Sequence, residues 1–447
     1  MFTKVLIANR GEIALRVQRT CRRLGIATLA VHSDVDAGQP FATEADEAVC
    51  IGPGPVAQSY LRGDEILRVA LERGASAIHP GYGLLSENAA FADCVEASGL
   101  VFIGPRSETI RQMGSKVAAR EIARGAGLRL VPGSPALESV EQGALEAERI
   151  GFPLLVKASA GGGGIGMTRV KKPKKLEQAL REAMDKGERF FGDSTVFLEK
   201  LIESPHHVEV QLLGDGSGKV LHLGDRECSL QRRHQKLLEE APGPFLSSAQ
   251  RQDLCERAVS LAQSINYRGA GTVEFVADRD GNFYFLEMNT RLQVEHTVSE
   301  AIYGIDLVEW QLRIAAGEEL SLEQHDLIPQ GHALEFRICA EDPSRKFAPS
   351  PGRLERWCPP AEGPGLRLDS GVTQGSEVSP YYDSLLAKLI VHGADRAQAI
   401  ARAREALELF DVVGINTTIG FHRQVLEQPE FLAGNYSTDL SKEMLRL

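Results

Sequence analysis

Hydrophobic and polar residues change their spacing along the first 110 residues of the chain. Residues 5–8 and 27–32 are short apolar runs that predict strands, and residues 12–24 between them repeat apolar positions at helical spacing. Strands that alternate with helices are typical of βαβ units around a parallel sheet. We therefore predict an α/β fold that begins with an open parallel sheet.

The remaining sequence divides into two further blocks. The pattern becomes helical near residues 115–135, breaks at the turn formers of residues 131–135, and a strand at residues 195–199 ends the next block. Beyond it, several strand-like runs accompany long helical patterns at residues 247–264 and 396–409. A chain of 447 residues suggests about three domains, at roughly 150 residues each. We predict an N-terminal α/β domain, a small unit with a glycine-rich loop, and a large α+β unit, at 1–115, 116–202 and 203–447.

Polar side chains alternate with apolar ones after the apolar run at residues 283–286. Glu287, Asn289, Arg291, Gln293 and Glu295 occupy every second position. A period of two predicts a strand with all five side chains on one face. Carboxylates, amides and a guanidinium together suit a cation and an anion held side by side. The alternative is the solvated face of a charged edge strand.

A second strand-like run, residues 271–276, lies just upstream and is joined to the first by the hairpin signal Asp280-Gly281. If these two residues form the loop, Glu274 lies directly opposite Glu287, although a bulge in the turn would shift the register by one residue. Facing like charges are destabilising unless something positive lies between them. Magnesium binds through carboxylates and substrate phosphates, so the pair predicts a nucleotide as well as a metal.

A glycine-rich loop follows a lysine at the end of another apolar run, residues 152–157. Lys157 supplies a point charge, and the glycines at residues 161–164 and 166 leave backbone N–H groups open to phosphate oxygens. The loop lacks the Gly-Lys-Ser/Thr of the Walker pattern, and residues 9–14 lack the glycines of a dinucleotide site. We predict a phosphate-binding loop of another kind, with a flexible linker as the alternative.

Three other polar segments are candidates for binding. The loop at residues 79–88 follows a strand at residues 76–78, a position where open α/β sheets bind ligands, although a plain connection is the alternative. Residues 227–236 combine cations and amides, which suits an anion, or else a solvated charged face. His206 and His207 are adjacent on a strand and point to opposite faces, so we expect no shared metal and one ordinary surface histidine.

Composition narrows the classes of function. The net charge of −11 argues against a nucleic-acid partner, and no apolar run approaches the ~18 residues of a membrane-spanning helix. The N-terminal apolar run is too short for a signal peptide. Seven cysteines without a C-x-x-C pair predict reduced thiols and a cytoplasmic location. Cys228 lies in a polar run, but nothing in the sequence activates it, and we expect no catalytic role.

These segments together resemble the ATP-grasp ligases, and the similarity to biotin carboxylases runs through nearly the whole chain. The motifs that carry it are IANRGEIALR (residues 7–16), HPGYGLLSEN (79–88), Lys157 with its glycines, RRHQK (232–236) and EMNTRLQVEH (287–296). The resemblance implies a biotin carboxylase N-terminal domain, an ATP-grasp lid with its linker, and a joint ATP-grasp and biotin carboxylase C-terminal domain. Residues 367–371 and 379–384 look more like the α subunits of acyl-CoA carboxylases than the stand-alone enzyme.

The resemblance also implies a role for each matching residue. It implies a catalytic group of Glu295, Arg291, Arg337 and Lys236. The implied binding residues are Lys116, Lys157, Gly163, Gly164, Gly166, Glu199, Leu201, His207, Gln231 and His234 for ATP; Glu274, Glu287 and Asn289 for the metal; Lys236, Arg291, Gln293, Val294 and Glu295 for bicarbonate; and Tyr82 and Arg337 for biotin.

The implied reaction is the first half-reaction of an acetyl- or acyl-CoA carboxylase. With Glu295 as base, bicarbonate would attack the γ-phosphate of ATP, with Mg²⁺ or Mn²⁺ as cofactor, to give carboxyphosphate and then carboxybiotin. No lysine lies between two methionines, so biotin is expected on a carrier protein or on a segment beyond this sequence. A carboxyltransferase subunit and a homodimer, with Arg16 near its interface, are the other implied partners.

Three positions depart from the commonest pattern of the family. Ile165 and Thr168 replace residues that are usually basic in the glycine loop, and Thr297 stands where proline is usual. The replacements at Ile165 and Thr168 would weaken the contacts of the lid to phosphate. The residues that would bind metal and bicarbonate are unchanged. The alternatives are another ATP-grasp carboxylate–amine ligase, which would not need Tyr82 or Arg337 in these contexts, and a non-catalytic scaffold homologue.

Overall fold

The structure is a computed structural model that describes residues 1–137, 139–158, 167–191 and 194–445. Its N-terminal part is a five-stranded parallel sheet in the order β3-β2-β1-β4-β5. The strands are β1 (Lys4–Ile7), β2 (Ala27–Ser33), β3 (Glu47–Gly52), β4 (Ala77–His79) and β5 (Val101–Phe102), and the helices are α1 (Gly11–Arg23), α2 (Pro40–Thr43), α3 (Gly63–Glu72), α4 (Ala89–Ala97) and α5 (Ser107–Gly114). The predicted parallel sheet is confirmed, with bounds shifted by one residue at most.

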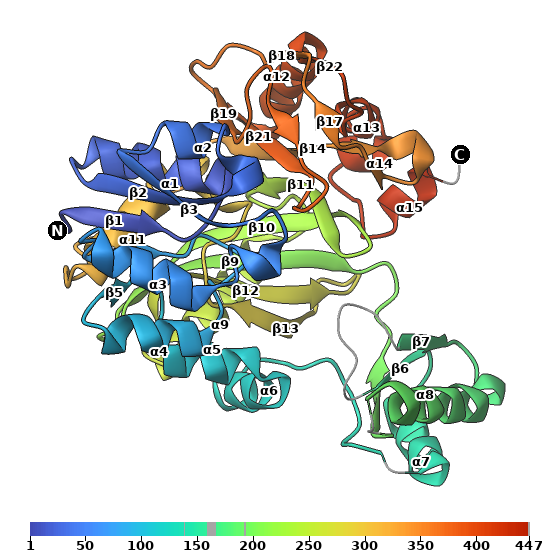
Figure 1. Cartoon of the computed structure of the whole chain (residues 1–447). Coiled ribbons are helices and arrows are strands. Elements are labelled where there is room, and N and C mark those ends of the chain that lie inside the picture. The colour runs from blue at the N-terminus through green and yellow to red at the C-terminus, as the bar shows by residue number, and fades with distance from the viewer. Residues whose placement is uncertain (138, 159–166, 192–193, 446–447) are drawn as a thin grey trace.

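A small antiparallel sheet, in the order β7-β6-β8, forms a separate unit at the lower right of Figure 1. It consists of β6 (Leu154–Ala158), β7 (Met167–Val170), β8 (Val196–Lys200), α7 (Val140–Ile150) and α8 (Leu176–Phe191). Leu154, Val156, Leu180 and Leu198 give this three-stranded unit a core of its own. The predicted glycine-loop residues Gly163, Gly164, Ile165 and Gly166 lie outside the described residues.

An eight-stranded antiparallel sheet forms the centre of the molecule, in the order β13-β12-β9-β10-β11-β14-β21-β19 (Figure 1). Its strands are β9 (His206–Asp215), β10 (Val220–Arg232), β11 (Gln235–Ala241), β12 (Arg268–Ala277), β13 (Phe283–Asn289), β14 (His332–Cys339), β19 (Leu366–Ser370) and β21 (Leu385–Gly393). Helix α9 (Ser248–Ser264) packs against β9 and β10, and α6 (Lys116–Gly125) shares the same core through Ala119 and Ala123.

Further helices and short strands cover the other end of this sheet. Helix α12 (Arg396–Leu409) packs on β14 and β21 and contributes Ala399, Ala403 and Leu407 to a second core. The remaining elements are α10 (His296–Tyr303), α11 (Leu307–Ala315), α13 (Ile419–Val425), α14 (Pro429–Leu432), α15 (Leu440–Met444), β15 (Glu341–Asp342), β16 (Ala348–Pro349), β17 (Gly352–Arg353), β18 (Arg356–Cys358), β20 (Glu377–Val378) and β22 (Asp411–Val413).

The predicted strand through Glu295 is wrong beyond Asn289. Strand β13 ends there, and residues 290–295 form an irregular segment that leads into α10. The physical reason is that β13 is the edge of its sheet and the next residues leave the ladder for other partners. Glu87 accepts hydrogen bonds from the Thr290 backbone N (3.0 Å) and from the Arg291 side chain (2.9 Å). We call residues 290–295 the polar segment below.

The pairing of Glu274 with Glu287 is confirmed, but not by the predicted route. The turn spans Asp278 to Asn282, whose backbones are hydrogen bonded, so the loop is one residue longer than the predicted pair Asp280-Gly281. With this longer loop and regular pairing, Glu274 would lie opposite Leu286 and not opposite Glu287. A β-bulge at Leu286 on β13 restores the pairing, because one residue is left unpaired between the Phe275–Phe285 and Glu274–Glu287 pairs.

Candidate active site

Four charged residues form a line across the central sheet. Glu287, Glu274, Glu209 and Arg226 are successive neighbours on β13, β12, β9 and β10. Directly paired residues project from the same face of a sheet, so the four side chains lie side by side. Glu209 and Arg226 are fully buried, whereas Glu287 is exposed at the sheet edge. The line therefore runs from solvent into the core.

Lys236 lies at the centre of the acidic residues. Its Nζ donates to Glu209 (2.5 Å), Glu274 (3.0 Å) and Glu295 (2.5 Å). Burial alone would lower the pKa of Lys236, but the three carboxylates raise it well above its usual value. The lysine thus stays charged at any pH at which the protein is folded and the carboxylates are ionised.

A tight turn places Lys236 at the start of β11. Arg232 pairs with Gln235, and the two residues between them have φ angles of 49° (Arg233) and 69° (His234). Positive φ at both positions is the geometry of a type I′ hairpin, which normally uses glycine or asparagine. Here the two positions are occupied by arginine and histidine, and backbone strain of this kind is characteristic of functional sites.

The Glu295 carboxylate is divided between two cations. Its Oε1 accepts from Lys236, and its Oε2 accepts from Arg337 Nη2 at 2.9 Å. Burial would raise the pKa of Glu295, but Lys236, Arg337 and Arg226 bring it well below the usual range. Arg337 is held in turn by Glu239, whose Oε1 lies 2.6 Å from Nε and 2.5 Å from Nη2. Burial raises the pKa of Glu239 to about 7.

Gln293 joins the polar segment to the charged line. Its Nε2 donates to Glu274 at 2.7 Å, and its Oε1 accepts from Arg226 at 2.8 Å. Asn289 also donates to Glu274 (2.9 Å) and accepts from Arg291 (3.0 Å). The predicted metal and bicarbonate residues are therefore linked by direct hydrogen bonds, and Glu274 is their common acceptor.

The residues predicted to hold ATP are less closely gathered. His207 lies 3.1 Å from Glu274, and burial lowers its pKa while Glu274 raises it, with a net rise. Gln231 reaches His207 at 3.4 Å. Lys157 forms an ion pair with Glu199, which also accepts from Arg120 at 3.1 Å. Lys116 and His234, which are also predicted to hold ATP, are exposed, and Leu201 is half-buried.

Tyr82, predicted to lie near biotin, donates a hydrogen bond to Glu12. Glu12 is buried at the start of α1, and its Oε1 lies 3.3 Å from Lys388 Nζ on β21. Three parts of the chain that are distant in sequence thus meet beside the polar segment.

Comparisons with known proteins cover the whole chain. Models of the biotin carboxylase N-terminal domain, the carbamoyl-phosphate synthase L chain ATP-binding domain and the biotin carboxylase C-terminal domain match residues 1–110, 115–323 and 335–443. A biotin carboxylase of Nostoc sp. is 53% identical over 444 residues, which cover 99% of each chain.

Two solved structures are similar to this chain. The biotin carboxylase domain dimer of Hydrogenobacter thermophilus 2-oxoglutarate carboxylase, in complex with MgADP, ADP and bicarbonate, superposes with a TM-score of 0.92, 46% identity, and coverage of 99% of this chain and 98% of that one. A biotin carboxylase from Campylobacter jejuni, in a β-γ-ATP complex, gives 0.92, 43% and 99% of both chains.

The chain belongs to the biotin carboxylase family. Its fold has the three parts of that family: an N-terminal parallel sheet, an ATP-grasp domain and a C-terminal domain. Its activity is the ATP-dependent carboxylation of biotin, a step of biotin-dependent carboxylases. In the described part of the chain, every helix is too short or too polar to span a membrane.

Sequence reasoning missed several buried charged residues that contact the predicted site residues. They are Glu12, Glu209, Arg226, Glu239 and Lys388. A signal was present for two of them, because Glu209 and Lys388 each stand alone in an apolar strand (HHVEVQLL and LLAKLIV). A lone charge in an apolar run predicts a buried group with a specific partner.

Two expectations about single residues can be compared with the structure. The prediction that one of His206 and His207 is an ordinary surface residue is wrong, because neither is exposed. The His206 ring stacks on Phe245 at 3.5 Å and lies 3.6 Å from Glu227. Cys228 is buried, and burial raises the pKa of its thiol well above the usual value. A thiol that stays protonated is a poor nucleophile, in keeping with the expected absence of a catalytic role.

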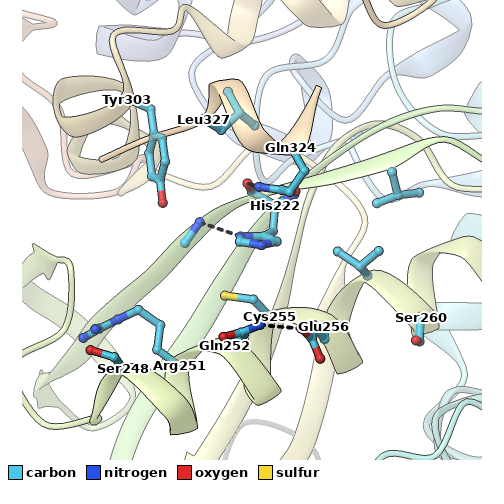
Figure 2. Close-up of a pocket in the computed structure, with 13 residues that line it drawn as sticks. His222, Ser248, Arg251, Gln252, Cys255, Glu256, Ser260, Tyr303, Gln324 and Leu327 are labelled. Carbon is cyan, nitrogen blue, oxygen red and sulfur yellow. Dashed lines mark hydrogen bonds between the residues drawn. The ribbon is translucent and has the colours of Figure 1, made fainter. Parts of the chain in front are cut away.

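A cavity of about 690 Å³ lies away from the charged line, between α9, β10 and the segment that follows α11 (Figure 2). His222 on β10, Cys255 and Glu256 on α9, and Tyr303 and Gln324 opposite them line it. None of the predicted site residues is among its lining residues. Cavity size alone would therefore direct attention away from the chemistry of this enzyme.

Proposed function

We propose that Glu295, Lys236, Arg291 and Arg337 are the catalytic group of this enzyme, acting on ATP, bicarbonate and the biotin of a carrier. The observation that supports this assignment is the single Glu295 carboxylate shared by Lys236 and Arg337. It combines a base with two cations that can receive anionic substrates.

Bicarbonate binding would activate the base. Lys236, Arg291, Gln293 and the backbone of Val294 would hold bicarbonate, which draws the cations away from Glu295. The pKa of Glu295 is low because Lys236, Arg337 and Arg226 surround it, so it would rise as Lys236 turns to the substrate. A base near neutrality is the efficient one for removing the bicarbonate proton.

Carboxyphosphate would be the intermediate that carries the carboxyl group to biotin. Deprotonated bicarbonate attacks the γ-phosphorus of ATP, the bond to the β-phosphate oxygen breaks, and carboxyphosphate and ADP form. Carboxyphosphate splits into CO2 and phosphate, and the phosphate takes the N1 proton of biotin. N1 then attacks CO2 to give carboxybiotin, while Arg337 stabilises the negative ureido oxygen.

The carboxylates at the sheet edge fit a divalent metal. Within the described residues, no hydrogen bond or ion pair engages the Glu287 carboxylate, and Glu274 lies directly opposite. Partial desolvation and the charge of Glu274 raise the pKa of Glu287, which a cation would reverse. Glu274, Glu287 and Asn289 would hold Mg²⁺ or Mn²⁺, and such a metal would neutralise phosphate charge.

ATP would lie between the charged line and the three-stranded unit. Lys116, Lys157, His207, Gln231 and His234 would contact its phosphates and sugar, and Glu199 and Leu201 its adenine, with Gly163, Gly164 and Gly166 covering the phosphates. Lys157 is paired with Glu199 in this structure, so phosphate would take the lysine from its carboxylate. Ile165 and Thr168, where basic residues are usual, would weaken the contacts of the glycine loop to phosphate.

The proposal extends to partners and location. A biotin carboxyl carrier protein or domain would deliver biotin, and a carboxyltransferase subunit would take the carboxyl group. The enzyme would act as a homodimer, in line with the dimer in the crystal structure of the 2-oxoglutarate carboxylase domain. All seven cysteines are free thiols, which supports a cytoplasmic enzyme.

The test is bicarbonate-dependent release of ADP on addition of free biotin or a biotinylated carrier. Glu295→Gln is expected to reduce this turnover on the order of a hundredfold or more, and Arg337→Ala to remove its dependence on biotin. Glu405→Gln, an exposed position on α12, is the matched control and should leave turnover unchanged. Wild-type protein that shows no bicarbonate-dependent turnover, or a Glu295→Gln variant as active as the control, would contradict the assignment.

A further inference from the structure

A fully buried lysine lies behind the catalytic residues. Lys388 is on β21, its relative exposure is 0%, and its cross-strand neighbours are Arg337 on β14 and Asp369 on β19. Its Nζ donates to the backbone carbonyl of Val294 at 2.9 Å. A charged group without water needs specific partners, and one of the partners chosen here is the main chain next to the proposed base.

The second partner of Lys388 is Glu12. The Nζ–Oε1 distance is 3.3 Å, and the same Oε1 accepts the hydroxyl hydrogen of Tyr82. The other oxygen, Oε2, is buried and has no hydrogen-bond partner in the described part of the chain. A continuous chain of contacts therefore runs from Tyr82 through Glu12 and Lys388 to Val294.

The polar segment needs such a support. After Asn289 it has no ladder hydrogen bonds, so each of its backbone groups depends on an individual partner. At the start of the segment, the Thr290 backbone N donates a hydrogen bond to Glu87. At its end, Lys388 donates one to the Val294 carbonyl, next to Glu295. A shift of this carbonyl would move the peptide that carries both Val294 and Glu295, and a misplacement of about 1 Å can cost about a hundredfold in rate.

We propose that Lys388 is a positioning residue that, through Glu12, ties the polar segment to Tyr82 and so sets the bicarbonate and biotin subsites in fixed register. This rests on the proposed function, because it takes Val294 and Glu295 as bicarbonate residues and Tyr82 as a biotin residue. Lys388 itself touches neither substrate. Its charge is balanced by Glu12 and Asp369, and Asp369 lies 4.0 Å from its Nζ.

The first experiment compares Lys388→Met and Lys388→Gln with a control lysine. Methionine keeps most of the volume and removes every donor, whereas the glutamine amide can still donate to Val294. Lys219→Met is the matched control, because Lys219 Nζ also donates to a backbone carbonyl, Leu320, at 2.9 Å, far along the chain from the site. Folding of each variant is checked by its thermal midpoint.

Lys388→Met is expected to lower biotin-dependent kcat on the order of ten- to a hundredfold while the KM for ATP stays unchanged. Lys388→Gln should recover part of that loss, and Lys219→Met should match wild type. A folded Lys388→Met variant with wild-type kcat would overturn the proposal. So would a loss that appears only as a raised KM for ATP, because that would place the effect at the nucleotide.

The second experiment is a double-mutant cycle between two residues that do not touch. Tyr82→Phe and Lys388→Met should be non-additive in kcat/KM for biotin, because either change breaks the same chain. The non-additivity should vanish when Glu12→Gln is present in all four proteins. Additive effects with wild-type Glu12 would overturn the proposal, even if both single variants are impaired.

Failure of the two proposals can be told apart. If Glu295→Gln retains activity, the proposed function fails whatever Lys388 does. If Glu295→Gln is inactive and the cycle is additive, the catalytic assignment stands and the positioning role fails.

Discussion

The eight-stranded sheet and the three-stranded unit treat their predicted site residues in opposite ways. On the large sheet, Lys236 donates hydrogen bonds to three carboxylates. The Arg226 guanidinium donates hydrogen bonds to five buried side chains. On the three-stranded unit, Lys157 contacts Glu199 alone among the described residues, and its side chain is 29% exposed. One site is built into a core, and the other is an open surface.

The difference suggests a division of labour between binding and chemistry. Groups that must be aligned for a reaction gain from a rigid, dry setting in which their dipoles are already oriented. Groups that admit and release a nucleotide gain from weak pairs that substrate can displace. On the proposed assignment, the bicarbonate residues would be assembled before substrate arrives, and Lys157 would exchange Glu199 for an ATP phosphate.

The largest expected effect tests the buried side of this contrast. Arg226→Met removes one cationic partner of the fully buried Glu209 and leaves it Lys236 and, at 3.8 Å, His207. We therefore expect a loss of about 3–5 kcal/mol in the free energy of unfolding. Urea unfolding measures it. Adding Glu209→Gln should restore part of the loss, and a single Arg226→Met variant as stable as wild type would show that the sheet is not held together by this network.

Acid should destabilise the three-stranded unit less than the rest of the molecule. Burial lowers the pKa of His79 and His422 to about 4 and that of His296 to about 3, from an ordinary value of 6.5. Their stabilising contribution is complete above pH 6.5 and is lost as pH falls toward 4, at about 1.4 kcal/mol per pH unit for each histidine.

The three-stranded unit has no histidine between residues 139 and 200, so it should lack this dependence. Hydrogen exchange at pH 7 and pH 5 should show lost protection in β4, α10 and α13 and none in β6 and β8 beyond the intrinsic change in exchange rate. His422→Gln should flatten the pH dependence around α13. Equal loss in both regions would remove this distinction between them.

Substitution on the open side should affect binding without affecting stability. Lys157→Met is expected to raise the KM for ATP about tenfold, or about 1.4 kcal/mol, because a partly exposed lysine contributes one charge to phosphate. The thermal midpoint should not change. Lys186→Met, an exposed residue of α8, controls for loss of charge on the same unit. A large fall in kcat with unchanged KM would instead give Lys157 a role in the chemical step.

The smallest expected effect lies at the boundary between the two regions. Because the pKa of Glu287 is raised, protons should compete with the metal, and the Mg²⁺ needed for half-maximal ADP release should rise as the pH is lowered from 7.5 to 6. Glu287→Gln should abolish this pH dependence along with most of the metal affinity. The same dependence in that variant would exclude Glu287 as its source.

Sequence reasoning was most successful where spacing alone decides the geometry. The strand–helix alternation predicted the parallel sheet. The Glu274–Glu287 pair was predicted from a two-residue turn; the turn is one residue longer, and the bulge at Leu286 restores the pair. Sequence reasoning failed at residues 290–295, where period two continues although the chain has left the sheet. Arg226 could not be found at all, because its five partners come from four separate segments. The roles of the individual site residues stay predictions.

The β-bulge at Leu286 has a consequence for how this hairpin tolerates change. The bulge, and not the turn, sets the pairing of Glu274 with Glu287. Each of the two features adds one residue to the chain between these glutamates, and each can be shortened independently of the other. Deleting one residue from the turn alone would shorten the loop to two residues and leave both the bulge and the facing carboxylates in place. Deleting a turn residue together with Leu286 would give a plain two-residue hairpin with the same two carboxylates still face to face.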